Sequence, residues 1–183
     1  GAILKFLADE SIAMAWENSR AAEAELPTSP PIIRRAVALA RQALDPLAVL
    51  SSACGQFKEI LTVRLHELEK YIPRELKGRY IDEVICTAVA QTGVDINVAV
   101  SEAWKAATLP FVPGLGYRKA AALLKMIRQG GGALGGRALL VEQDLLGPVV
   151  YRNAAPFLVV TNSSAASQQY GFDLIDATRI HPD

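Results

Sequence analysis

The sequence predicts a mainly α-helical fold whose second half contains two helix–turn–helix units in tandem. Apolar residues recur at helical spacing along most of the chain, and prolines and glycines stand where helices would begin and end. Two similar turns, PGLG at 113–116 and LLGP at 145–148, each separate a pair of helical segments. With 183 residues, of which 51% are hydrophobic, the chain can form one domain or two small ones.

The first half is expected to contain three helices and one short strand. Residues 11–26 have a helical composition, and apolar positions recur every three or four residues over 32–44. The alternating pattern of residues 59–68 predicts a strand. A long helix follows, from a first turn at Pro73 to a C-terminal cap at Gly93.

The second half has a regular pattern of short helices and turns. Asp95 or Asn97 can cap a short helix, after which the PGLG turn leads into a longer one. Four apolar residues at helical spacing form the buried face of that longer helix: Ala120, Leu123, Leu124 and Ile127. The glycine-rich segment 130–136 is expected to be a loop. Pro148 begins the last helix, and residues 161–172 have the composition of a linker.

The PGLG turn has three candidate interpretations: a dinucleotide loop, a phosphate-binding P-loop and a hairpin between helices. A dinucleotide loop needs a third glycine three residues after Gly116, where Lys119 stands. A P-loop needs a lysine and a hydroxyl residue after its glycines, but the neighbouring glycine-rich segment is followed by Arg137 and Ala138. The remaining interpretation is a helix-hairpin-helix motif, in which Leu115 packs between the two helices.

A helix-hairpin-helix turn presents backbone amides at the N-terminus of its second helix, where the helix dipole favours an anion. A nucleic-acid phosphate is the natural ligand for such a site. Positive charge concentrates in this region, because residues 93–160 carry a net charge of +3 and the rest of the chain −3. The predicted nucleic-acid-binding residues are Gly114, Leu115, Gly116, Arg118, Lys119, Lys125 and Arg128.

Two features favour a purely structural role for parts of this region. A basic helix face of this size is often only solvated, so the first hairpin could be a structural element without a ligand. The second turn has Leu145 in place of the first glycine, and Pro148 removes an amide donor. We therefore expect the second hairpin to be structural.

The sequence contains no recognisable catalytic set. His66 and His181 have no cysteine or carboxylate at metal-ligand spacing beside them, and Asp45 before Pro46 fits a turn or a helix end better than a metal site. We therefore predict no catalytic residue, no metal and no cofactor. The formal net charge of zero and the lack of an apolar run of roughly 18 residues argue against a membrane partner. The two cysteines at no recognisable spacing fit a reducing compartment.

Five sequence blocks in a fixed order resemble the eukaryotic suppressor of Ty six family of transcription elongation factors and histone chaperones. These blocks are residues 16–47, 92–97, 109–127, 145–160 and 175–183. The bacterial Tex proteins resemble the chain more distantly. Two positions depart from the usual family pattern: Pro113, where cysteine or serine is common, and Tyr117, where proline is common. Neither departure removes a glycine of the PGLG turn.

The resemblance implies a domain organisation that composition alone does not reveal. Residues 1–56 would be the C-terminal part of an α/β ribonuclease-H-like (YqgF-like) domain, and residues 57–92 a connecting strand and helix. Residues 93–160 would be the tandem helix-hairpin-helix domain, and 161–183 a linker and the start of the next domain. Because the chain begins abruptly in an apolar run, we expect it to be a fragment of a longer protein.

The resemblance also implies a function. The region would be a non-catalytic scaffold that binds the backbone of DNA or RNA weakly and without sequence specificity. The full protein would act in the nucleus, on chromatin, with RNA polymerase II and histones as partners. Two alternatives stay open: a purely structural or protein-interaction core without direct DNA contact, and a bacterial-type Tex RNA-binding transcription factor.

Overall fold

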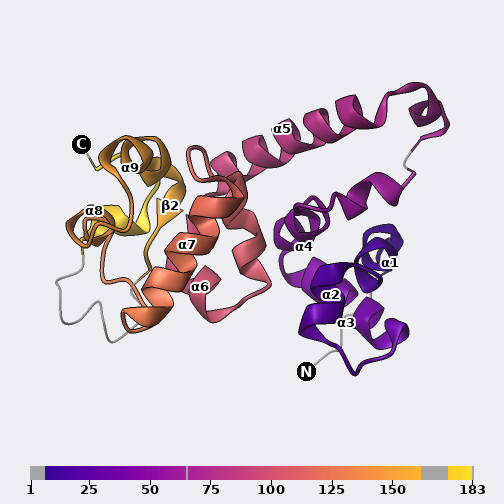
Figure 1. Ribbon diagram of the computed structural model, residues 1–183, viewed down its shortest axis with the longest axis horizontal. Coiled ribbons are helices and arrows are strands. Elements are labelled where there is room, and N and C mark those ends of the chain that lie inside the picture. Colours follow the sequence, from indigo (N-terminus) through magenta and orange to yellow (C-terminus); the bar gives the residue numbers. More distant parts are fainter. Residues whose placement is uncertain (1–6, 65, 162–172, 183) are drawn as a thin grey trace. The chain divides into compact units, whose positions relative to one another are not determined.

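The computed structural model describes residues 7–64, 66–161 and 173–182 (Figure 1). The fold is mainly helical, as predicted. The chain forms two compact units, Gly1–Ile81 and Asp82–Asp183, and the long helix α5 (Arg74–Thr92) runs through the division between them. The linker predicted over 161–172 lies outside the described residues except for Thr161.

The described residues of unit 1 form four α-helices and two 3₁₀ helices before α5. They are α1 (Ser11–Glu17), α2 (Arg20–Glu25), α3 (Pro31–Leu44), α4 (Pro46–Ala53), η1 (Glu59–Thr62) and η2 (Glu67–Tyr71). Prolines begin α3 and α4, where the missing amide costs nothing. Asp45 caps α4 by accepting a hydrogen bond from the Ala48 amide at 3.0 Å, so it is a helix-terminal residue, as the sequence indicated.

The core of unit 1 is built from small side chains around one tryptophan. Ala13, Trp16, Ala22 and Ala38 are buried together, and the alanines allow α1, α2 and α3 to approach closely. The Trp16 indole donates to the Ser52 hydroxyl at 3.1 Å, which ties α1 to α4. The ion pair between Arg35 and the buried carboxylate of Glu17 ties α1 to α3.

The prediction of a strand over 59–68 is wrong for the described residues of that segment. They form η1 and η2 instead, and only Ile60 is buried in η1. In the described part of the chain the strands are β1 (Val94–Asp95) and β2 (Leu158–Val159), which pair with each other. The alternating segment therefore has no described partner strand with which to form a ladder.

The first short helix of unit 2 also differs from the prediction. Asp95 caps α6 (Ile96–Ser101) by accepting from the Val98 amide at 3.1 Å, which decides between the two predicted caps. Apolar residues at helical spacing from Val100 to Ala107 predict one continuous helix, but this helix is divided, because α6 ends at Ser101. The chain then resumes as the 3₁₀ helix η3 (Lys105–Phe111), which contains Pro110.

The remaining elements of unit 2 form the two hairpins and their closure. They are α7 (Gly116–Gln129), α8 (Leu139–Glu142), α9 (Pro148–Ala154), η4 (Ala155–Phe157) and η5 (Leu174–Ala177). The pairing of β1 with β2 is parallel, with Val94 opposite Leu158. It therefore joins the beginning of the hairpin region to its end.

Two buried polar residues hold the loops of unit 2. The Asn97 amide donates to the Leu134 carbonyl at 2.9 Å and accepts from the Leu134 amide at 2.7 Å, so it fixes the glycine-rich loop. Arg137 is fully buried. It bonds Asp176 through Nε at 2.8 Å and donates to the carbonyls of Ala155, Ile175 and Ile180. The described C-terminal segment 173–182 is thereby attached to the hairpin region.

Candidate nucleic-acid interface

The first hairpin turn has the backbone conformation that its two glycines predict. Gly114 and Gly116 have φ angles of 88° and 69°, in the left-handed region that favours glycine. Between them, Leu115 is only 4% exposed, and its amide donates to the Val112 carbonyl at 3.1 Å. Leu115 therefore packs in the core, and it acts on the site by fixing the turn.

The surroundings of the two glycines differ. A Cβ atom on Gly114 would lie 3.2 Å from the Cβ of Asn153, so α9 packs directly against this position. A Cβ atom on Gly116 would meet no atom within 4 Å. Gly114 thus serves both the turn and the contact between the hairpins, whereas Gly116 serves only the turn.

Helix α7 presents an apolar face to the core, as predicted. Near the hairpin turn, two aromatic rings pack against each other. Ala120, Leu123 and Ile127 are buried, and Leu124 is half-buried. Tyr117 packs edge-on against Phe111, with ring centroids 5.9 Å apart. The start of α7 is therefore held rigidly against the end of η3.

The first amides of α7 have no side-chain cap. The N-cap residue is Leu115, whose side chain cannot accept a hydrogen bond, and the turn residues Gly114 and Gly116 are exposed. Orphan amides at the start of a 14-residue helix combine hydrogen-bond donors with the positive end of the helix dipole. This end of α7 is therefore open to an anionic ligand.

The helix also carries four basic residues and no acidic ones. Arg118, Lys119, Lys125 and Arg128 are all exposed. Arg118 and Lys125 lie seven residues apart on one face, and among the described residues neither forms an ion pair. Between these two basic residues, the exposed side chains of Ala121 and Ala122 are small and project little from the helix.

Two of the four basic side chains contact the protein itself. The Lys119 ammonium donates to the Gly114 carbonyl at 3.0 Å across the turn. The Arg128 guanidinium lies 3.4 Å from the Val100 carbonyl, a long hydrogen bond. Arg118 and Lys125 are therefore the predicted residues most available to a ligand, and Lys119 also stabilises the turn.

The second hairpin has the same apolar plug but a different turn. Leu146 is buried like Leu115, and its amide donates to the Leu140 carbonyl at 2.8 Å. The positive φ angle falls on Asp144, at 55°, rather than on a glycine. Asp144 and Glu142 are exposed beside this turn, and Pro148 occupies the first position of α9. The negative charges of Asp144 and Glu142 disfavour the binding of a phosphate at this turn.

One basic residue of segment 93–160, Arg137, does not lie on the surface. Arg137 was included in the net charge of +3, but it is buried and paired with Asp176. Its charge is therefore neutralised inside the protein, and the basic surface is formed mainly by α7. Sequence spacing gave no signal for this pair, because its members are 39 residues apart. The same is true of Asn97 and Leu134, which are 37 apart.

The histidines have capping roles. The His66 ring accepts from the Leu68 amide at 3.1 Å, and Glu69 completes a capping box around it. The His181 ring lies 3.0 Å from the Arg152 carbonyl at the last turn of α9. Within the described residues, no three histidine, cysteine or carboxylate side chains are grouped to hold a metal ion. No described helix is long and apolar enough to cross a membrane.

Comparison with known proteins agrees with this geometry. The profile of the helix-hairpin-helix motif family matches residues 58–161, which include both turns. A transcription elongation factor SPT6 homolog of Arabidopsis thaliana is 40% identical over 180 residues, 96% of this chain. Transcription elongation factor SPT6 of Drosophila melanogaster is 32% identical over 176 residues, again 96% of the chain. The chain belongs to the suppressor of Ty six family.

The similarity covers nearly the whole chain but only a small part of each relative. The chain spans 11% of the Arabidopsis protein, 10% of the Drosophila protein and 12% of spt6 from Schizosaccharomyces pombe, to which it is 30% identical. The chain therefore spans about a tenth of the length of these relatives, and it contains the helix-hairpin-helix match.

Proposed function

We propose that this region is a non-catalytic, nucleic-acid-binding scaffold of a eukaryotic transcription elongation factor. The names of the relatives support transcription elongation, and the helix-hairpin-helix match supports contact with nucleic acid. The proposal extends to the whole protein: a nuclear factor that acts with RNA polymerase II and histones on chromatin. It includes the assignment of residues 1–56 to the end of a YqgF-like domain.

The observation that carries the proposal is the uncapped, basic start of α7 beside the exposed glycine turn. A backbone phosphate can accept hydrogen bonds from the first amides of this helix. Arg118 and Lys125 then add charge along the strand, and the small Ala121 and Ala122 allow the strand to approach. Because every nucleotide has the same phosphate, such binding has no sequence specificity.

Two alternatives have weaker support. A purely structural hairpin is favoured by the Lys119 contact with the Gly114 carbonyl and by the packing of α9 on Gly114. These contacts leave Arg118, Lys125 and the α7 amides without a structural role. A bacterial-type Tex factor is disfavoured by the match to relatives from a plant, a fly and a fission yeast.

Fluorescence anisotropy with a labelled DNA duplex tests the proposal. The variant Arg118→Glu/Lys125→Glu leaves the turn-stabilising Lys119 intact, and it should bind much more weakly than the unmodified chain at low salt. If two phosphate contacts are lost, the slope of log K against log salt should become shallower by about 1.8. The same titration with single-stranded RNA tests the DNA or RNA preference.

The matched control is Arg74→Glu/Arg79→Glu, at two exposed positions of α5. Both double variants change the net charge of the chain by the same amount, so a general charge effect would weaken them equally. Equal binding by all three proteins, or no binding by the unmodified chain at low salt, would contradict the proposal.

A further inference from the structure

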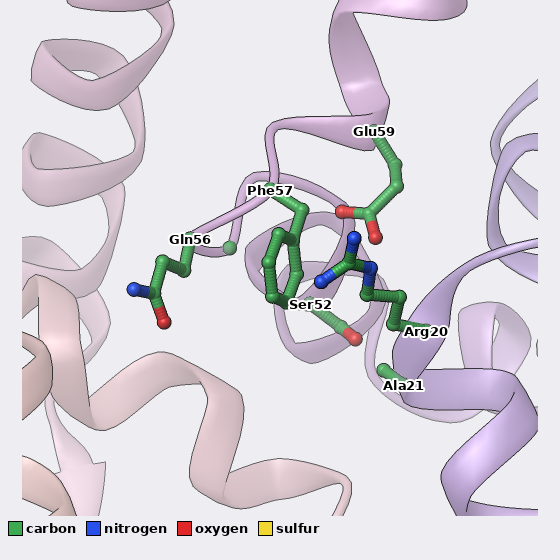
Figure 2. A pocket seen from close by; sticks show the side chains of 7 residues that line it. Arg20, Ala21, Ser52, Gln56, Phe57 and Glu59 are labelled. Atoms are coloured by element: carbon green, nitrogen blue, oxygen red, sulfur yellow. The ribbon is translucent and has the colours of Figure 1, made fainter.

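A hollow of about 290 Å³ lies in unit 1, between the start of α2 and the loop that follows α4. Its walls include Arg20, Phe57 and Glu59, and Ser52 belongs to its lining (Figure 2). Phe57 is 52% exposed, although burial of an aromatic ring is strongly favourable. Phe57 is one of several large apolar side chains that are exposed among the described residues, and it lines a hollow with charged walls.

The backbone fixes Phe57 in this exposed position. The Gly55 amide donates to the Ser52 carbonyl at 3.1 Å, and the Lys58 amide donates to the Gly55 carbonyl at 3.0 Å. Lys58 has a φ angle of 55°, a left-handed conformation that a lysine rarely adopts. Strain of this kind is retained mostly where the surroundings impose it, often at ligand sites. Phe57 is thus presented by a tight, built turn.

The lining of the hollow is anchored to the core of unit 1. The Ser52 hydroxyl accepts from the indole of Trp16, which is only 4% exposed. A Cβ atom on Gly55 would lie 2.9 Å from the Ser52 carbonyl oxygen, so this turn admits only glycine without a shift. The part of the hollow formed by Ser52 and Gly55 is therefore anchored to the core.

The polar groups around the ring include both donors and acceptors. The Arg20 guanidinium lies over the Phe57 ring, 4.3 Å from its centroid. Figure 2 shows the Glu59 carboxylate reaching toward the same space, while Gln56 extends on the other side of the ring. Arg20 is exposed, at the first position of the short helix α2. Its guanidinium can therefore move outward without disturbing the core.

We infer that this hollow binds an unpaired nucleobase of a single-stranded nucleic acid. Aromatic rings and arginine planes are the two groups on which unpaired bases stack in proteins. The base would lie on the Phe57 ring, with the Arg20 guanidinium moved to its outer face. The edge of a base carries donors and acceptors together, and the Glu59 carboxylate, on the Arg20 side of the ring, can accept a hydrogen bond from it.

A neutral base fits this hollow better than a basic side chain of a partner protein. An incoming arginine or lysine would take the place of the Arg20 guanidinium on the ring and would be repelled by its charge. A base instead retains the arginine as a second stacking partner. The two ligands make opposite predictions for Arg20→Ala, which should weaken base binding and strengthen the binding of a basic peptide.

This site is separate from the hairpin of unit 2, and the inference does not depend on the proposed phosphate contact there. The probe is a single-stranded oligonucleotide with one central 2-aminopurine, whose fluorescence is quenched when the base stacks. We expect quenching on binding to the whole chain. Phe57→Ala should remove the quenching and weaken the affinity about 5-fold to 100-fold. Phe57→Tyr should retain both.

The controls separate this site from others. Tyr71→Ala, at another exposed aromatic residue, should have no effect. Arg118→Glu/Lys125→Glu should weaken any backbone binding but leave the Phe57-dependent quenching at saturation. Three results would overturn the inference: unchanged binding by Phe57→Ala, equally tight binding of free 2-aminopurine nucleotide, or binding of an arginine peptide that Arg20→Ala strengthens.

Discussion

Gly114 and Gly116 show how two residues of one type can have different roles in a single turn. Both have positive φ angles, so a side chain at either position costs backbone strain of about 1–2 kcal/mol. Only Gly114 also faces a neighbouring element, because the Asn153 side chain would lie 3.2 Å from a new Cβ.

We predict that Gly114→Ala destabilises unit 2 more than Gly116→Ala does. Gly116→Ala should cost about 1–2 kcal/mol, the price of the left-handed backbone alone. Gly114→Ala should cost about 1–3 kcal/mol more, since α9 must shift to make room. Urea unfolding followed by circular dichroism measures both values. Equal losses would show that α9 does not pack on the first turn in solution.

At the residue scale, the sequence predicted what depends on neighbours along the chain. Leu115 as the plug, a helix cap at either Asp95 or Asn97, and the glycine φ angles all follow from local spacing and backbone sterics. The Arg137–Asp176 pair could not be predicted, because a lone arginine in a basic stretch looks like a surface residue. Its burial is stabilised by carbonyls from distant segments.

At the element scale, the two hairpins share a plug but differ in charge. The first turn leads into α7, with four basic residues and no acidic one. The second turn carries Glu142 and Asp144, and α9 begins with a proline. The sequence predicted Leu115 as the plug of the first hairpin and the loss of an amide donor at Pro148 in the second. The position of the positive φ angle at Asp144 was not predictable, since that residue lies one place before the LLGP motif.

Helix boundaries were less predictable than helix faces. Periodicity placed Ala120, Leu123 and Ile127 correctly on the buried side of α7. It missed the break after Ser101 and favoured a strand over η1, because alternation in a short segment does not reveal whether a partner strand exists. Tertiary context decides both cases.

The tie between α1 and α3 predicts a pH dependence for unit 1. Arg35 donates to the Glu17 carboxylate at 2.7 Å and 3.0 Å, and this hydrogen bonding lowers the pKa of Glu17 below its ordinary value of 4.5. A lowered folded-state pKa means that the stabilisation is present above pH 4.5 and is lost as the pH falls through the folded-state pKa.

We therefore expect unit 1 to lose stability below pH 4.5, and Glu17→Gln to reduce this loss while lowering the stability at neutral pH. Trp16 fluorescence in a Trp104→Phe background reports the unfolding of unit 1 alone, because Trp16 is its only tryptophan. An unchanged pH profile in Glu17→Gln would contradict the assigned role of this pair.

At the scale of the whole molecule, each unit has its own means of closure. Unit 1 is joined by the Trp16–Ser52 bond and the Glu17–Arg35 pair. Unit 2 is closed by the β1–β2 pairing and by Arg137, with the described C-terminal segment as its last layer. The sequence predicted the helical class and the tandem hairpins. It could not predict these closures, which join segments more than 15 residues apart.

The central claim is that the first hairpin turn meets a nucleic-acid phosphate through its backbone amides. Two-dimensional ¹H–¹⁵N NMR of the chain, titrated with a short DNA duplex, tests it most directly. We predict that the NMR signals of the Gly116 and Arg118 amides shift most. Gly131 and Gly132 are controls, because they also have exposed or half-exposed loop positions and positive φ angles, and their amide signals should stay in place. The Gly147 amide of the second turn should also stay in place. If the duplex binds while Gly116 and Arg118 do not shift, or if Gly147 shifts as much as they do, the claim is wrong.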